Sequence, residues 1–257
     1  MMTSFKGLVI VFGLLLNQNS LAFTQDVIRL TNGEWPPYTS ENLKDFGIFS
    51  HIVTEVFALE KINVEYGFYP WKRAYEYAKS GSWEGSVCWY WSEERSKDVY
   101  FSDPVMNGDE MFFYLKDHPF EWKTIEDLKG KQIGAVIGYF AGEEFQKAEQ
   151  SGLITVERIA TDVQNFKKLL SGRLDIMVMN LYVGYDLIRK HFSPQEAEKV
   201  THHPQAINTG ALHLILSKQN LKNSARVVAF NRGLAKLKTS GKIDHYLQDV
   251  IKGGYDK

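Results

Sequence analysis

Residues 81–104 read GSWEGSVCWYWSEERSKDVYFSDP, and this stretch decides the fold class. Gly81 ends a helical pattern, the run 87–91 is typical of a strand, and the proline of Ser102-Asp103-Pro104 prevents the strand from continuing. Arg95 stands between that strand and the turn, behind a Trp-Tyr-Trp cluster. An arginine fork pairs with carboxylates, and aromatic rings supply apolar walls and cation–π faces. The stretch predicts either a pocket for a small anionic or aromatic solute, or a strand of buried aromatics that ends in a solvated turn.

Outward from this stretch, the apolar spacing alternates between two and three to four residues, which is typical of an α/β protein. The pattern predicts strands at 27–31, 62–68, 87–91, 111–115, 132–136, 153–159, 174–179 and 209–216. It predicts helices at 47–60, 71–79, 124–128, 143–150, 162–170, 224–238 and 243–251. A joint of helix, glycine and strand occurs twice, at 78–84 and 170–175. This repeat predicts two similar α/β lobes, with one continuous doubly wound sheet as the alternative.

The order of motifs resembles the bacterial extracellular solute-binding proteins of family 3, the polar amino-acid type. In that family a Gly-x-x-Asp strand entry leads to Thr-x-x-Arg and Phe-Ser-x-Pro, which read here Gly81-Ser-Trp-Glu84, Ser92-Glu-Glu-Arg95 and Phe101-Ser-Asp-Pro104. The resemblance implies a periplasmic-binding-protein-like type II fold, in which a two-strand hinge joins two α/β lobes and the ligand cleft lies between them. It implies a first lobe of residues 23–112 and 209–257, and a second lobe of residues 113–208.

The amino terminus has the pattern of a secretory signal. Lys6 precedes an apolar run at 7–16, and Ser20-Leu21-Ala22 forms a small-x-small cleavage site. We therefore expect a signal peptide at 1–22 and a periplasmic protein without a lipid anchor, because no cysteine lies near the cleavage site. The single cysteine, Cys88, cannot form an internal disulfide and is expected to be a small buried residue.

The composition argues against several classes of partner. The formal net charge is −1 and the charges are interspersed, so the chain has no basic stripe for nucleic acid or an anionic membrane. His202 and His203 point to opposite sides of an extended segment, and no third ligand is evident. We expect a monomer that has no cofactor, no metal and no nucleic-acid partner.

The resemblance implies roles for individual residues. Arg95 occupies the place of the arginine that holds a ligand carboxylate. The second carboxylate clamp, a Gly-Thr-Thr turn in the family, reads Gly138-Tyr139-Phe140 here. Asn180 replaces the aspartate that pairs with the ligand ammonium, and an amide contributes no charge to that pairing. An ordinary α-amino acid is therefore a less secure ligand, although Glu34 or Asp109 could compensate.

Aromatic residues replace the small polar groups of the family site. Alternation along a strand puts Trp89 and Trp91 on one face and Tyr90 on the other. Arg73 adds a cation near the rim, or is a solvated helix residue. The expected ligand-binding residues are Arg95, Trp35, Tyr38, Trp71, Trp89, Tyr90, Trp91, Tyr139, Phe140, Asn180 and Tyr182.

The expected function is capture of a small polar solute, an amino acid or a related carboxylate or aromatic compound, for delivery to an ABC importer. A sensor protein in the membrane is the alternative partner. The fold also includes cyclohexadienyl dehydratases, so an enzyme is a second alternative, with Glu34, Glu84 and Asp175 as candidate acids. Because Glu84 and Asp175 belong to the strand-entry repeat, we predict a binding protein with no catalytic residues.

Overall fold

The computed structural model describes residues 26–137 and 141–257. The predicted signal peptide at 1–22, together with Tyr139 and Phe140, lies outside the described residues. The strands are β1 (Asp26–Asn32), β2 (Ile62–Phe68), β3 (Gly85–Tyr90), β4 (Val99–Phe101), β5 (Met106–Leu115), β6 (Gln132–Val136), β7 (Thr155–Ile159), β8 (Ile176–Asn180), β9 (Val200–His202) and β10 (Asn208–Ser217).

The helices follow the predicted apolar periods at most places. They are α1 (Ile48–Leu59), α2 (Trp71–Ser80), α3 (Glu93–Ser96), α4 (Glu143–Gln150), α5 (Asp162–Leu170), α6 (Leu181–His191), α7 (Pro194–Ala197), α8 (Asn223–Thr239) and α9 (Lys242–Ile251), with 3-10 turns η1 (Lys44–Phe46) and η2 (Ile125–Leu128). The short helix expected at 124–128 is a 3-10 turn. The sequence patterns missed α3, α6, α7, β4 and β9.

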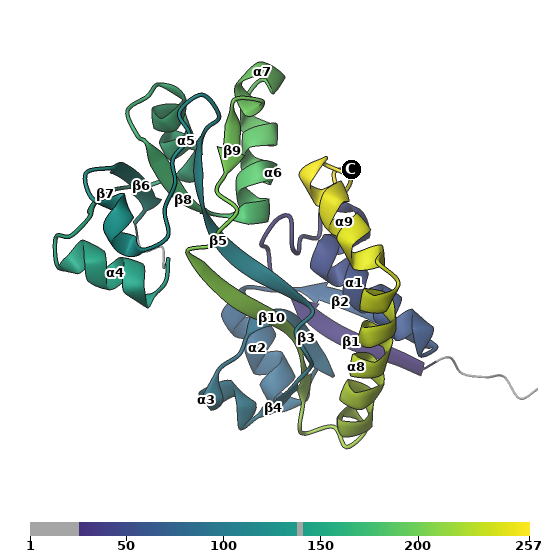
Figure 1. Ribbon diagram of the computed structural model, residues 1–257. Helices are drawn as coiled ribbons and strands as arrows, with labels where there is room; N and C mark the ends of the chain where they lie inside the picture. The colour runs from purple at the N-terminus through teal and green to yellow at the C-terminus, as the bar shows by residue number, and fades with distance from the viewer. Residues whose placement is uncertain (1–25, 138–140) are drawn as a thin grey trace, which may run out of the picture.

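Two long antiparallel strands, β5 and β10, connect the two halves of the molecule (Figure 1). The sheet runs in the order β2-β1-β3-β10-β5-β8-β6-β7 within the described residues, with β4 beside β10 and β9 beside β5. Strands β1, β2 and β3 are parallel at one end, as are β6, β7 and β8 at the other. The hydrogen-bonded sheet is therefore continuous. Its two groups of parallel strands are connected by β10 and β5, the two strands that the sequence analysis predicted to form a hinge.

The apolar cores lie in the two lobes on either side of this connection. In the first lobe, α1, α8 and α9 cover one core, and α2 covers a smaller one around Trp89. In the second lobe, Phe112 and Phe113 project from consecutive positions of β5 into two different cores. Alternation along a strand separates these two side chains onto opposite faces. Two α/β lobes joined by two strands, as the sequence predicted, are confirmed.

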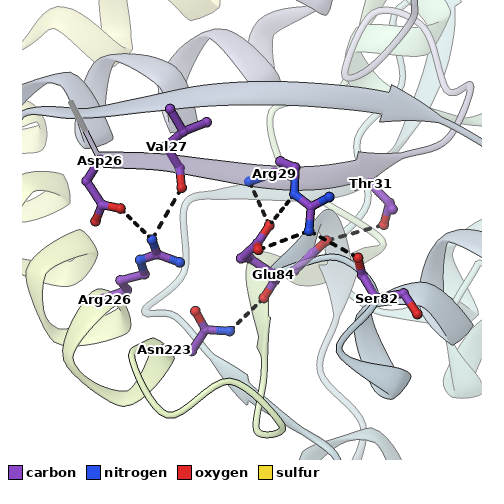
Figure 2. A network of polar contacts seen from close by, with 9 residues as sticks. Asp26, Val27, Arg29, Thr31, Ser82, Glu84, Asn223 and Arg226 are labelled. Atoms are coloured by element: carbon purple, nitrogen blue, oxygen red, sulfur yellow. Dashed lines mark hydrogen bonds and ion pairs between the residues drawn. The ribbon is translucent and has the colours of Figure 1, made fainter. Parts of the chain in front are cut away.

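The strand-entry repeat has the same structural role in both lobes. At the entry to β3, the Glu84 carboxylate accepts the backbone N–H of Arg29 at 3.0 Å and two bonds from its guanidinium (Figure 2). Before β8, the Asp175 carboxylate accepts the backbone N–H of Gln132 at 2.7 Å. Each carboxylate thus fastens the start of one strand to its parallel neighbour, which satisfies a backbone donor at the sheet end.

The lobes also touch on one side of the connecting strands, where α6 packs against α9 (Figure 1). A cavity of about 320 Å³ lies there, and it is lined by Asn107 and Asp109 of β5, Tyr182 of α6 and Asp244 of α9 among others. We call this the back cavity. Asp109 and Tyr182 therefore line a different cavity from the one around Arg95.

Candidate functional site

The loop after β1 is held rigidly and presents two aromatic rings. Trp35 and Thr39 exchange backbone hydrogen bonds of 2.8 and 3.1 Å, which closes the Pro-Pro-Tyr segment between them. The first free N–H groups of α1 donate to the carbonyls of Pro37 and Tyr38. Gly47 precedes this helix with a φ of 91°, and a Cβ there would lie 2.6 Å from the Tyr38 carbonyl oxygen. The loop and α1 form one unit, in which the Trp35 and Tyr38 rings stack 4.4 Å apart.

A β-bulge in β3 immediately precedes the aromatic cluster. Along β10, His213 pairs with Trp89 and Ile215 pairs with Ser86, so β3 contains one residue more than its partner between these pairs. Cys88 within this bulge has a φ of 67°, in the left-handed region that non-glycine residues rarely adopt. Bulges change the direction of the side chains that follow them. Trp89 and Tyr90, which follow the bulge, pair in regular register with His213 and Leu212, so the bulge changes the alternation between Ser86 and Trp89.

The residues after the bulge help to form a cavity of about 320 Å³ at the edge of the first lobe. Its walls are Trp35, Trp71, Cys88, Trp89, Tyr90 and Arg95. Trp71 stands perpendicular to Trp89, with ring centroids 5.3 Å apart, and Trp35 is tilted against Tyr90 at 6.3 Å. Gly33 makes room for Trp71, since a Cβ at Gly33 would lie 2.4 Å from the indole ring. We call this space the Arg95 cavity.

Arg95 lies at the wall of this cavity with its charge over aromatic faces. Its guanidinium carbon is 5.0 Å from the centroid of the Trp89 ring and 5.8 Å from that of Tyr75, and its Nη1 donates to the carbonyl of Tyr90 at 3.2 Å. In the part of the chain that the structure describes, no carboxylate forms an ion pair with Arg95, and this holds for the neighbouring Glu93 and Glu94 as well. A partly exposed guanidinium in this arrangement can donate hydrogen bonds to the carboxylate of a ligand.

Trp71 and Trp89 each donate a hydrogen bond from the indole N–H to another part of the protein. Trp89 is 8% exposed, and its indole N–H donates to the Ser86 hydroxyl at 2.8 Å. The indole N–H of Trp71 donates a long bond of 3.4 Å to the Glu34 carbonyl. Trp89 therefore belongs both to the small core under α2 and to the cavity wall. Cys88 is buried, as expected, and burial raises the pKa of its thiol well above the ordinary value.

Tyr38 and Asn180 connect the two lobes instead of lining the Arg95 cavity. The buried Tyr38 hydroxyl donates to Asn180 Oδ1 at 3.0 Å, and the same oxygen accepts the N–H of Val183 at 3.4 Å as the cap of α6. Burial raises the pKa of the Tyr38 hydroxyl well above its ordinary value, although the bond to Asn180 opposes this. Tyr182 meets Tyr38 edge to face at 6.0 Å. The amide oxygen expected to receive a ligand ammonium is thus committed to two protein donors.

Other predicted residues lie apart from the Arg95 cavity. Trp91 follows the end of β3, is 60% exposed and does not line the cavity. Arg73 is exposed on α2. The Glu34 carboxylate accepts the N–H of Glu41 at 2.9 Å. Glu34 therefore helps to close a turn in the first loop.

Sequence reasoning missed Glu110, a residue of β5 that is only 6% exposed. The predicted strand began at Met111, one position later, because the preceding residues Asn107-Gly108-Asp109 are typical of a loop. A strand extended back to Met106 would have revealed Glu110 by alternation, on the same face as Gly108.

Within residues 26–137 and 141–257, none of the helices combines the length and the apolar composition that a membrane span requires. Residues 27–252 match the model of the family described as bacterial extracellular solute-binding proteins, family 3. The chain is 24% identical over 251 residues to the arginine-binding periplasmic protein of Mannheimia haemolytica, covering 96% of this chain and 98% of that protein. The solved structures include two further relatives of similar fold.

One is the second substrate-binding domain of Lactococcus lactis GlnP in an open conformation, with a TM-score of 0.72 and 17% identity, covering 89% of this chain and 97% of that one. The other is the unliganded open L-cystine solute receptor of Neisseria gonorrhoeae, with a TM-score of 0.71 and 18% identity, covering 89% of this chain and 94% of that one. Both have the two-lobed type II periplasmic-binding-protein fold.

Proposed function

The chain belongs to the bacterial extracellular solute-binding proteins of family 3, and from this premise we propose that it captures a small solute bearing a carboxylate at the Arg95 cavity. Arg95 anchors the carboxylate with its guanidinium fork. Trp35, Trp71 and Tyr90 provide flat walls for the apolar part of the solute. The observation that carries this proposal is an arginine held over the Trp89 ring, at the wall of an aromatic cavity, without a carboxylate partner among the described residues.

Capture requires the second lobe to close over the first. We take residues 106–110 of β5 and 208–212 of β10 as the hinge, because these segments pair with each other between the two lobes. The lobe division otherwise follows the sequence prediction, except that Met111 and Phe112 belong with the second lobe because their side chains pack in its cores. A hinge of two strands allows rigid lobes to rotate, and closure around a ligand shields the ion pair with Arg95 from water.

The closed protein then presents a new surface to a membrane partner. An ABC importer is the partner we propose, because the family match and the binding proteins similar to this chain favour uptake of a solute. The sequence pattern at 1–22 supports secretion to the periplasm. We propose that the protein acts there as a monomer and without a cofactor. A sensor in the membrane remains the alternative partner.

A binding role is also favoured over an enzymatic one. Glu84 and Asp175 hold backbone N–H groups at strand entries, and Glu34 holds a turn. A general acid must reach the leaving group of a substrate, and each of these carboxylates has a structural partner elsewhere. Turnover of prephenate or arogenate by the purified protein would contradict this conclusion.

A thermal-melt screen of residues 23–257 against amino acids, organic acids, amines and aromatic carboxylates tests the proposal. A ligand at about a hundred times its dissociation constant adds roughly 2.7 kcal/mol, which raises the melting temperature by about 5–10 °C for a protein of this size. Arg95→Gln should abolish the shift, whereas Arg73→Gln, on an exposed arginine of α2, should retain it. No shift with any carboxylate, or an equal shift in Arg95→Gln, would contradict the proposal.

A further inference from the structure

The segment that follows α9, residues 252–257, is fixed to the first lobe. Tyr255 is 5% exposed and belongs to the apolar core of that lobe. Its hydroxyl forms a hydrogen bond of 2.7 Å with Nδ1 of His51 in α1, and its carbonyl accepts the N–H of Lys44 at 2.9 Å. Because a side chain and a backbone group of Tyr255 are both held there, this segment moves with the first lobe.

The next residue, Asp256, contacts the second lobe. Its carboxylate pairs with the Arg189 guanidinium of α6 through both oxygens, since Oδ2 accepts from Nη1, and Oδ1 accepts from Nη2 at 3.2 Å. The Lys190 ammonium of the same helix lies 3.7 Å from Oδ1. We call Arg189, Lys190 and Asp256 the Asp256 clasp. It connects the two lobes at a place outside the hinge strands.

Two features of the fold orient the cations of the clasp. Asp186, one turn earlier in α6 and only 4% exposed, accepts a hydrogen bond of 2.7 Å from Arg189 and one of 2.8 Å from Lys190. Gly253 has a φ of 81°, and a Cβ there would lie 2.8 Å from Arg189 Nη1. Side chains that are already held lose less conformational entropy when they form an ion pair. The clasp is therefore stronger than a chance pairing of two long surface side chains.

The clasp and the Arg95 cavity lie on opposite sides of the hinge strands. The contact between α6 and α9 borders the back cavity, which Asp109 of β5 lines. Gly108, the preceding residue, faces the Arg95 cavity, because a Cβ there would lie 2.5 Å from the Tyr90 hydroxyl. Successive residues of a strand point to opposite faces. Figure 1 shows the same division, with α6 and the end of α9 on one side of β5 and β10, and α2, α3 and α4 on the other.

The lobes are open at the Arg95 cavity in this arrangement. Among the described residues, those that line the cavity all belong to the first lobe. Closure has to bring the second lobe over the cavity by rotation about β5 and β10, and a rotation that narrows one side of a hinge widens the other. Arg189 lies nine residues after Asn180. This spacing corresponds to about 13 Å along α6, so a rotation of about 10° displaces Arg189 by about 2 Å. A displacement of that size breaks a hydrogen bond.

We propose that the Asp256 clasp holds the lobes open and thereby sets the affinity of the Arg95 cavity for its solute. This inference rests on the proposed capture of a carboxylate by closure of the lobes. The ion pairs of the clasp form when the cavity is open and break when it closes, so they oppose binding. The apparent affinity rises when a larger fraction of the protein occupies the closed state. The clasp acts through the hinge and does not touch the solute.

Titration calorimetry of the full mature protein with the best carboxylate from the melt screen tests this role. Asp256→Asn removes the negative charge of the clasp and should tighten binding by about two- to fivefold, because partly exposed ion pairs contribute modestly. Arg189→Gln should act in the same direction. The double variant should tighten binding by less than the product of the two single effects, because both substitutions remove the same pairing. Unchanged or weaker binding in Asp256→Asn would overturn the proposal.

Asp249→Asn is the matched control, because it removes one negative charge from α9 itself. The Asp249 carboxylate lies 3.6 Å from Nε2 of His245 in the same helix, so its ion pair lies within the first lobe. The affinity of this variant for the carboxylate should equal that of wild type. If Asp249→Asn tightens binding as much as Asp256→Asn, the effect comes from net charge and the clasp has no such role.

A measurement without solute separates the clasp from the proposed function. A spin label on Lys97→Cys, at an exposed residue directly after α3, enhances the relaxation of amide signals of α4 when the lobes close. The buried Cys88 does not compete for the label. Asp256→Asn should increase this enhancement by about two- to fivefold, in proportion to the closed population, and Asp249→Asn should leave it unchanged.

The outcomes of this measurement are distinct. If the enhancement in Asp256→Asn equals that of wild type, the clasp does not hold the lobes open, and the proposal is refuted even where solutes bind through Arg95. If the enhancement rises but no carboxylate binds to wild type, the clasp holds the lobes open and the proposed function fails.

Discussion

Two arginines of the first lobe lie over tryptophan rings, but their surroundings give them different roles. Arg29 lies 5.5 Å from the centroid of Trp83, and its guanidinium also forms a two-pronged pair with Glu84 (Figure 2). Arg95 lies 5.0 Å from the centroid of Trp89 and donates to the carbonyl of Tyr90. The carboxylate partner makes the first arginine part of the scaffold. Without such a partner, the second can bind a carboxylate from solution.

Removal of the Glu84 charge should give the largest change in stability. Glu84→Gln keeps a similar shape but loses the charge that holds the Arg29 guanidinium and backbone N–H, so the free energy of unfolding should fall by about 1–2 kcal/mol. Urea unfolding at neutral pH measures this change. Arg95→Gln should stay within about 0.5 kcal/mol of wild type, because it breaks no ion pair among the described residues. An equal loss in both variants would contradict the contrast between the two arginines.

The ion pair between Arg29 and Glu84 predicts that the stability of the fold depends on pH. Burial raises the pKa of the Glu84 carboxyl, but the bonds from the Arg29 side chain and backbone outweigh it, so the pKa lies below its ordinary value of 4.5. A carboxyl with a lowered folded-state pKa stabilises the fold above its unfolded-state pKa, and this contribution is lost as pH falls through the folded value. The difference between wild type and Glu84→Gln should therefore narrow below about pH 4.5. A difference that stays constant down to pH 3 would argue against the ion pair.

A smaller effect on stability is expected from Tyr38→Phe, which changes the ring that stacks on Trp35 and leaves Arg95 unaltered. The variant removes the hydrogen bond from Tyr38 to Asn180 between the lobes, and should lower the free energy of unfolding by about 1 kcal/mol. Ligand affinity should change by less than about fivefold, because the Arg95 cavity retains its walls. Denaturant unfolding and calorimetry give the two quantities. Complete loss of binding would show that the Tyr38 hydroxyl, and not Arg95, anchors the ligand.

Helices and strands could be predicted from the sequence where the spacing of apolar residues agrees with the packing of the neighbouring elements. The strands Ile62–Phe68 and Gln132–Val136 begin and end where the alternation predicted. The helix α6 was missed, although Asn180 is a favourable cap, because Gly184 lowers the helical propensity. Gly184 is explained by tertiary contact, since a Cβ there would lie 2.5 Å from the Phe113 ring. Packing between elements thus overrides the local pattern at this position.

At the candidate site too, some features followed from the sequence and others became visible only in the structure. The position of Arg95 followed from the motif, and its lack of an ion pair among the described residues became visible only in the structure. The face that Trp89 occupies relative to the start of β3 could not be predicted, because the bulge at Cys88 shifts the alternation before it and has no sequence signal of its own. Glu110 was missed for a related reason: residues 106–110 have the composition of a loop but pair as a strand.

The most direct measurement of the central claim is a thermodynamic cycle between Arg95 and the ligand carboxylate. The best carboxylate from the melt screen and its primary amide are titrated into wild type and into Arg95→Gln. Wild type should bind the carboxylate about 30-fold or more tightly than the amide, and Arg95→Gln should bind the two within about threefold of each other. If Arg95→Gln retains the full preference for the carboxylate, the anchor is another residue and the proposed role of Arg95 is wrong.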